Sequence, residues 1–129
     1  MTRIKLMIAA AAALIAGSAM AADLPAGVQA RKSDAGPVVL ADAKGMTLYT
    51  FDRDASGKSN CNGQCATNWP PLMAGADAKA SGDWTIVTRD DGGKQWAYKG
   101  KPLYEFAKDT KPGDVAGDGV NSVWHIAAP

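Results

Sequence analysis

The chain has 129 residues, of which 47% are hydrophobic and 21% are charged, and its formal net charge is +1. A chain of this length forms one ordinary domain with a hydrophobic core of modest size. The charge balance provides no excess of lysine and arginine, which a nucleic-acid-binding surface or an electrostatically held membrane surface requires. We therefore expect no nucleic-acid partner.

The beginning of the chain has the layout of a cleavable secretory signal. Arg3 and Lys5 precede an uncharged apolar stretch that is too short to span a bilayer, since spanning takes about 20 apolar residues. Ala19 and Ala21 then form the small-residue pattern at which such signals are cleaved. We predict a signal peptide at residues 1–21; the alternative is an uncleaved membrane-anchoring helix.

Cleavage at this point leaves residues 22–129 as a single exported domain. Its 12 basic and 13 acidic residues nearly balance. No second apolar stretch reaches membrane-spanning length, so we expect no transmembrane anchor after signal cleavage. The predicted location is the periplasm or the cell exterior.

The sequence repeats itself with a shift of 55 residues. This shift aligns 44–54 with 99–109, where Lys, Gly, Leu, Tyr, Phe and Asp coincide, and it places Trp69 on Trp124 without a gap. So many matches, one of them a rare tryptophan, indicate a duplicated unit. We place the two repeat units at about 36–73 and 84–127.

Each repeat contains a strand that is aromatic on one face. In the first repeat Tyr49 and Phe51 are two residues apart and share a face, whereas Leu48 points to the other face. Asp54 follows where an Asx-type turn would end the strand. Two interpretations of the aromatic residues stay open, namely core packing and an exposed platform that binds a ligand. The second repeat has Leu103, Tyr104, Phe106 and Asp109 at the same places.

The remaining sequence also favours β structure. Residues 84–89 are rich in β-branched and aromatic residues, 90–93 form a turn signal, and 95–98 resume an alternating pattern. A short helical turn at 64–68 is compatible with the sequence because the prolines at 70 and 71 would stop it. We predict an all-β fold of short, mainly antiparallel strands and long loops, with two pseudo-repeated β units in one small domain.

The motif Tyr-x-Phe-x-x-Asp, present twice, carries a family resemblance. The chain resembles the bacterial secreted-repeat family of predicted lipoproteins with a Yx(FWY)xxD motif, and the segment 61–72, with its two cysteines and Trp-Pro-Pro, is similar to that family too. The resemblance covers nearly all of residues 22–129 and implies export rather than a particular activity. Lipoprotein members carry lipid on a cysteine directly after the signal, and this chain has none there, so we expect an untethered protein.

Cys61 and Cys65 are the only cysteines in the chain. In an oxidising compartment an even number of cysteines usually forms disulfides, so we expect a bridge between these two. The 55-residue shift places Ala116 and Val120 at the corresponding positions of the second repeat, where we expect apolar packing to replace the bridge. This correspondence favours a structural disulfide over a redox-active one.

Two metal alternatives stay open, although we expect no cofactor. Cys61, Cys65, Met73 and the lone His125 offer soft ligands of the kind that suit copper(I), and Met46 is a further thioether. The loop acids at 109, 114 and 118 offer oxygen ligands for calcium but lack the register of an EF-hand loop.

No motif of the sequence points to catalysis. A triad would have to use His125, and no nucleophile elbow, Walker loop or zinc-protease motif occurs. We name no catalytic residue and expect a non-catalytic binding or structural module of the cell envelope, with an envelope ligand or protein as its partner. The alternative is a periplasmic thiol, copper or redox-associated protein.

Overall fold

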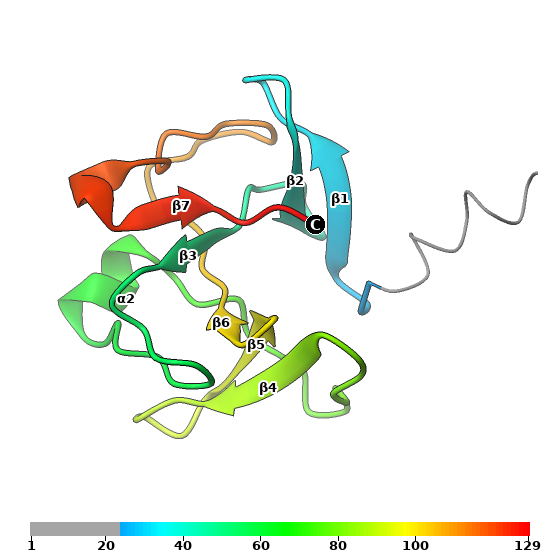
Figure 1. Ribbon diagram of the computed structural model, residues 1–129, viewed down its shortest axis with the longest axis vertical. Helices are drawn as coiled ribbons and strands as arrows, with labels where there is room; N and C mark the ends of the chain where they lie inside the picture. The colour runs from blue at the N-terminus through cyan, green and yellow to red at the C-terminus, as the bar shows by residue number, and fades with distance from the viewer. Residues whose placement is uncertain (1–23) are drawn as a thin grey trace, which may run out of the picture.

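The computed structural model describes residues 24–129, and the predicted signal peptide lies outside this part of the chain. An antiparallel hairpin opens each repeat. In the first repeat β1 (Val28–Lys32) pairs with β2 (Val38–Asp42), and in the second β4 (Trp84–Thr88) pairs with β5 (Lys94–Tyr98). Figure 1 shows the two hairpins apart from each other, with the other elements between and beside them.

Shorter elements complete the two repeats. The strand β3 (Tyr49–Phe51) pairs with β7 (Trp124–Ile126), and β6 (Lys101–Pro102) adds a third strand beside β5. The helix α2 (Gln64–Asn68) ends before the two prolines, as the sequence predicts. The described strands thus form small antiparallel sheets, which confirms the predicted all-β fold class.

The two repeats are interlocked rather than placed side by side. Tyr49 and Tyr104, which coincide under the 55-residue shift, exchange both backbone hydrogen bonds at N···O distances of 2.7 and 2.9 Å. This is the geometry of a hydrogen-bonded pair in an antiparallel ladder, and it lies where the two repeats meet. The end of each repeat also forms a backbone hydrogen bond with the other repeat. The Leu72 N–H donates to the Leu103 carbonyl, and the Ala127 N–H donates to the Leu48 carbonyl.

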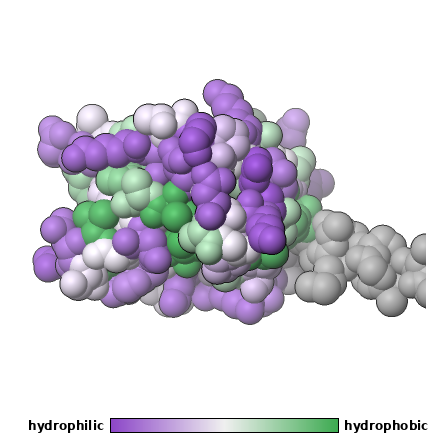
Figure 2. Space-filling model, turned by 90° about the horizontal axis from the view of Figure 1, so that it is seen from above, coloured by the Kyte–Doolittle hydropathy of each residue, from purple (hydrophilic) through white to green (hydrophobic). Residues whose placement is uncertain are grey.

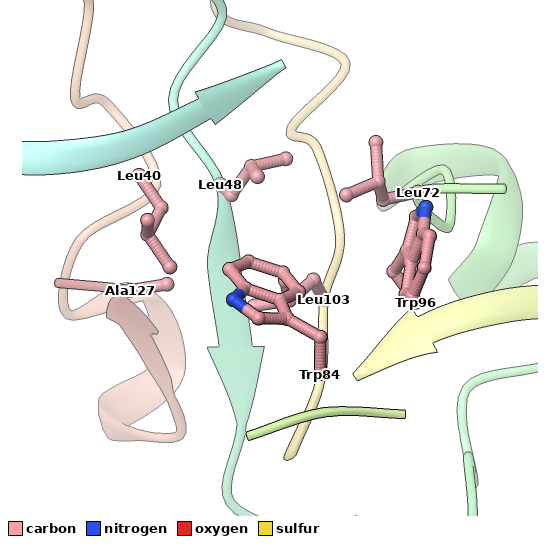
Figure 3. Close-up of a cluster of buried hydrophobic side chains, with 7 residues drawn as sticks. All are labelled: Leu40, Leu48, Leu72, Trp84, Trp96, Leu103 and Ala127. Atoms are coloured by element: carbon pink, nitrogen blue, oxygen red, sulfur yellow. The ribbon is translucent and has the colours of Figure 1, made fainter. Parts of the chain in front are cut away.

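One hydrophobic cluster joins the two hairpins. Leu48 and Leu103 are fully buried in it, on the strand face opposite to Tyr49 and Tyr104. Burying a leucine or tryptophan side chain contributes about 1.5–3 kcal/mol, so this cluster is a main source of stability. Figure 3 shows its members, which come from both repeats: Leu40, Leu48, Leu72, Trp84, Trp96, Leu103 and Ala127.

The surface is hydrophilic over most of the face shown in Figure 2, with hydrophobic residues visible between the hydrophilic ones. Among residues 24–129, the exposed large hydrophobic residues are Val38 and Met73. No helix in that part of the chain has the length and apolar character needed to cross a membrane.

Candidate functional site

The two Tyr-x-Phe-x-x-Asp motifs bind each other. The Tyr49 hydroxyl of the first motif donates to Asp109 Oδ2 of the second at 2.6 Å. The Tyr104 hydroxyl of the second motif donates to Asp54 Oδ2 of the first, also at 2.6 Å. The spacing Tyr-x-Phe-x-x-Asp therefore does not describe a contact within one repeat, because each tyrosine reaches the aspartate of the other.

The aromatic side chains form one column through the interlocked region. Trp69 and Trp124 stack with ring centroids 3.8 Å apart and an interplanar angle of 2°. Phe106 stacks on the outer face of Trp69 at 4.0 Å, and Phe51 stacks on the outer face of Trp124 at 4.2 Å. Both tryptophans are buried, with 5% and 3% of their surface exposed, so only ring edges reach the outside.

The tyrosines hold this column from its sides. Tyr49 meets Trp69 edge to face at 5.5 Å, and Tyr104 meets Trp124 in the same way at 5.2 Å. Burial, together with the hydrogen bond to Asp109, raises the pKa of Tyr49 well above its ordinary value. Burial and the bond to an aspartate raise the pKa of Tyr104 similarly, so both hydroxyls remain protonated donors at neutral pH.

A buried arginine completes the polar network on the Tyr104 side. The Arg89 guanidinium donates to Ser59 Oγ at 3.0 Å, to Gln95 Oε1 at 2.8 Å and to the Cys61 carbonyl at 2.7 Å. Ser59 Oγ in turn lies 2.6 Å from the Tyr104 hydroxyl. Arg89 is 4% exposed; these neutral acceptors take up most of its guanidinium N–H groups, and its Nε lies 3.8 Å from Asp91 Oδ1.

Cys61 and Cys65 form a disulfide at the start of α2. Cys61 is fully buried against the aromatic column, whereas Cys65 is half-buried. The bridge therefore fixes the short helix that carries Trp69 just beyond its end.

The second repeat replaces the bridge differently from what the sequence predicts. Val120 is half-buried against the column, but Ala116 is exposed and its N–H donates to Asp109 Oδ1. The neighbouring Gly117 is buried instead, because a Cβ at this position would lie 2.9 Å from the rings of Trp69 and Tyr49. Close packing of a glycine against the column thus replaces the expected apolar side chain.

Two hollows lie side by side along the edges of the aromatic column. The Phe51 hollow measures about 390 Å³ and the Phe106 hollow about 240 Å³. Figure 1 shows α2 and the segment before β7, which supply their common wall, on the same side of the molecule. Asn68, Trp69 and Asn121 line both hollows; Phe51, Arg53, Cys65, Val123 and Trp124 line only the first, and Phe106, Ala107, Lys108 and Val120 only the second.

The hollows follow the repeat symmetry. Phe51 and Arg53 of one hollow coincide with Phe106 and Lys108 of the other under the 55-residue shift. Each hollow therefore has an aromatic wall and one exposed cation at corresponding places. Among residues 24–129, no acidic side chain lines either hollow.

The backbone is strained at the wall that the hollows share. Asn121 and Ser122 have φ angles of 52° and 61°, in the left-handed region that side-chain-bearing residues rarely adopt. Such strain gathers at functional sites, where the surrounding structure holds it in place. Asn121 lines both hollows, so the strained turn is part of the candidate site.

Two larger hollows lie elsewhere, with volumes of about 420 and 500 Å³. Residues of the segments 24–26 and 75–84 line them, together with the aromatic side chains of Trp96 and Tyr98. Both adjoin the first residues that the structure describes, and neither combines residues of the duplicated motif.

Three of the candidate metal ligands have other partners in the structure. Cys61 and Cys65 are bonded to each other, and His125 Nε2 lies 2.7 Å from Asp52 Oδ2 on the surface. Met73 is 52% exposed, beside Gly93. Within residues 24–129, no three His, Cys, Asp or Glu side chains lie close enough together to hold a metal ion.

The loop acids are engaged in hydrogen bonds as well. Asp114 Oδ2 accepts the N–H of Thr110 at 2.8 Å, and Asp118 Oδ1 accepts the N–H of Ile126 at 3.3 Å. Asp109 uses both oxygens, for Tyr49 and for the backbone of the same loop. These carboxylates thus organise the loop between Phe106 and β7.

The fold and the duplicated motif define a small disulfide-bonded β domain made of two interlocked repeats. A family model described as "secreted repeat of unknown function" matches the chain twice, at residues 30–73 and 85–128. The chain therefore belongs to this family of secreted repeats, as its motif predicts. Comparisons with curated proteins and with solved structures find no match.

Three functional features were not predicted from the sequence. The buried Arg89 follows a strand and precedes two aspartates, so it has the pattern of a solvated surface charge. The strained turn at Asn121 had a weak signal, since asparagine tolerates the left-handed region better than most residues. The shared wall of the hollows could not be anticipated because it joins Asn68 and Asn121, which do not correspond in the repeat.

Proposed function

We propose that this domain is a non-catalytic binding module of the cell envelope, working in the periplasm or at the cell exterior, and that its ligand occupies the paired hollows. The observation that carries the proposal is the pair of symmetry-related hollows along the edges of the Trp69–Trp124 stack. Binding sites are typically concave and aromatic-lined, with a few polar groups that orient the ligand.

The rigidity of the site supports this function. The column is fixed by edge-to-face tyrosines, by two short Tyr–Asp hydrogen bonds and by the disulfide. A site whose walls are already in place loses little conformational entropy when it binds. The exposed groups at the rim, Arg53, Asn68, Lys108 and Asn121, are then available for recognition.

The test is a fragment screen by NMR on ¹⁵N-labelled protein, with benzoate, benzyl alcohol and methyl glucoside as probes. We expect at least one probe to shift the amide signals of residues that line the hollows, Asn68 and Asn121 among them. The variant Asn68→Trp should block the site, because this exposed side chain lines both hollows. The matched control is Thr67→Trp, at an exposed position of α2 that lines neither hollow.

Shifts that map to the hollows, persist in Thr67→Trp and disappear in Asn68→Trp support the proposal. Shifts confined to other surfaces, or unchanged in Asn68→Trp, overturn it. Thermal melts of both variants establish that they are folded.

A further inference from the structure

The two hollows form one elongated site. They share Asn68, Trp69 and Asn121, so a ligand that fills one touches the wall of the other. Ligand pockets usually measure about 300–1,000 Å³. With about 390 and 240 Å³, each hollow has room for a group about the size of one monomer unit, and a chain of such units can occupy both.

The charges at the site favour an acidic ligand. Arg53 and Lys108 are exposed, one at each hollow, and among the described residues neither takes part in an ion pair. In contrast, Lys58 and Lys111 are paired with aspartates. Since no carboxylate of the described part of the chain lines the hollows, the two unpaired cations are the charges that a ligand meets in their lining.

The ring edges and the amides act in the same direction. An aromatic ring is negative on its faces and positive at its edge, and only edges of Trp69 and Trp124 reach the hollows because their faces are stacked. The side-chain amides of Asn68 and Asn121 are exposed and line both hollows, where a ligand can reach them. Amide N–H groups can donate to hydroxyl or carboxylate oxygens.

Resting on the proposed function, we propose that the paired hollows bind a linear acidic polysaccharide, with acid groups of the chain at Arg53 and Lys108. A single exposed ion pair contributes only about 0–1 kcal/mol. Two such contacts on one chain reinforce each other, because the first raises the effective concentration of the second. The repeat symmetry of the site thus matches the repeat symmetry of a polymer.

The test compares a galacturonate hexamer with the galacturonate monomer and with neutral dextran of similar length, titrated against the exported form of the protein. We expect the hexamer to bind more than about tenfold tighter than the monomer. Its affinity should fall as salt rises, because the contacts are exposed ion pairs. A polyglycerol phosphate of the same length distinguishes carboxylate from phosphate as the preferred acid.

Two double variants distinguish the effect of these two cations on binding from the effect of the protein's net charge. The double variant Arg53→Gln with Lys108→Gln should weaken hexamer binding by about tenfold, since both charged contacts with the chain are lost together. The control is Lys32→Gln with Lys94→Gln, which removes the same charge at exposed positions that line neither the paired hollows nor the two larger ones and should leave binding unchanged.

Equal binding of dextran and galacturonate hexamer, or an unchanged affinity in the Arg53 and Lys108 double variant, overturns the acidic ligand. If fragment binding is lost in Asn68→Trp while no acidic polymer binds, the acidic ligand is wrong and the binding site stands. If Asn68→Trp changes the binding of neither fragments nor polymers, the proposed function itself is wrong.

Discussion

The exchange of tyrosine contacts between the repeats makes a quantitative prediction. Tyr49→Phe removes a hydroxyl that donates to Asp109 at 2.6 Å and accepts from Gly117 N–H at 3.2 Å. Hydrogen bonds to charged groups contribute about 1.5–3 kcal/mol, and Asp109 is 7% exposed, so water does not replace the lost donor. We expect Tyr49→Phe to lower the free energy of unfolding by about 2–3 kcal/mol.

The partner is identified by a double-mutant cycle. Tyr49→Phe combined with Asp109→Asn should show a coupling energy of about 1–2 kcal/mol, because the two residues share a hydrogen bond. Tyr49→Phe combined with Asp54→Asn, which joins residues of the same motif, should be additive within about 0.5 kcal/mol. Urea unfolding followed by tryptophan fluorescence measures both. A larger coupling energy for Tyr49 with Asp54 than for Tyr49 with Asp109 would refute the exchange of contacts between the motifs.

Further predictions concern the column, the disulfide and a half-buried acid. Trp69→Ala and Trp124→Ala should each cost about 3–5 kcal/mol in thermal or urea unfolding, whereas wild-type melting would show that the tryptophans are not core residues. The double variant Cys61→Ala with Cys65→Val should remain folded by circular dichroism and lose about 2 kcal/mol of unfolding free energy. Complete unfolding would contradict a disulfide that contributes only modestly to stability. Burial, with the nearby Asp42 carboxyl, raises the pKa of Glu105 from 4.5 to about 8. The folded state then keeps a proton that the unfolded state releases, so stability should fall as pH rises from about 4.5 to 8, and Glu105→Gln should flatten this slope. An identical slope in that variant would exclude Glu105 as its source.

The faces of the strands could be predicted from the sequence, but their partners could not. Alternation placed Leu48 opposite to Tyr49, and the structure has them in different hydrophobic clusters. Periodicity says which side chains share a face and nothing about which strand lies alongside. In a duplicated chain the pairing within a repeat and the pairing between repeats have the same pattern, so the interlocking of β3 with β7 required the structure.

The candidate site shows the same limit at the level of single residues. The sequence predicts that Asp54 ends its strand in a local turn, and its N–H does bond to Phe51 O at 3.0 Å. Its carboxylate, however, accepts both a local N–H and the hydroxyl of Tyr104, which is 50 positions away. The hollows likewise lie where the two repeats meet, since Asn68 of one repeat and Asn121 of the other line both of them.

A crystal structure of the protein with a bound galacturonate oligomer tests the central claim most directly. The account predicts one chain across the edge of Trp69, between Asn68 and Asn121, with acid groups beside Arg53 and Lys108. An oligomer bound instead in the hollows next to Leu24–Ala26, with the edges of the Trp69–Trp124 stack left uncovered, would contradict it.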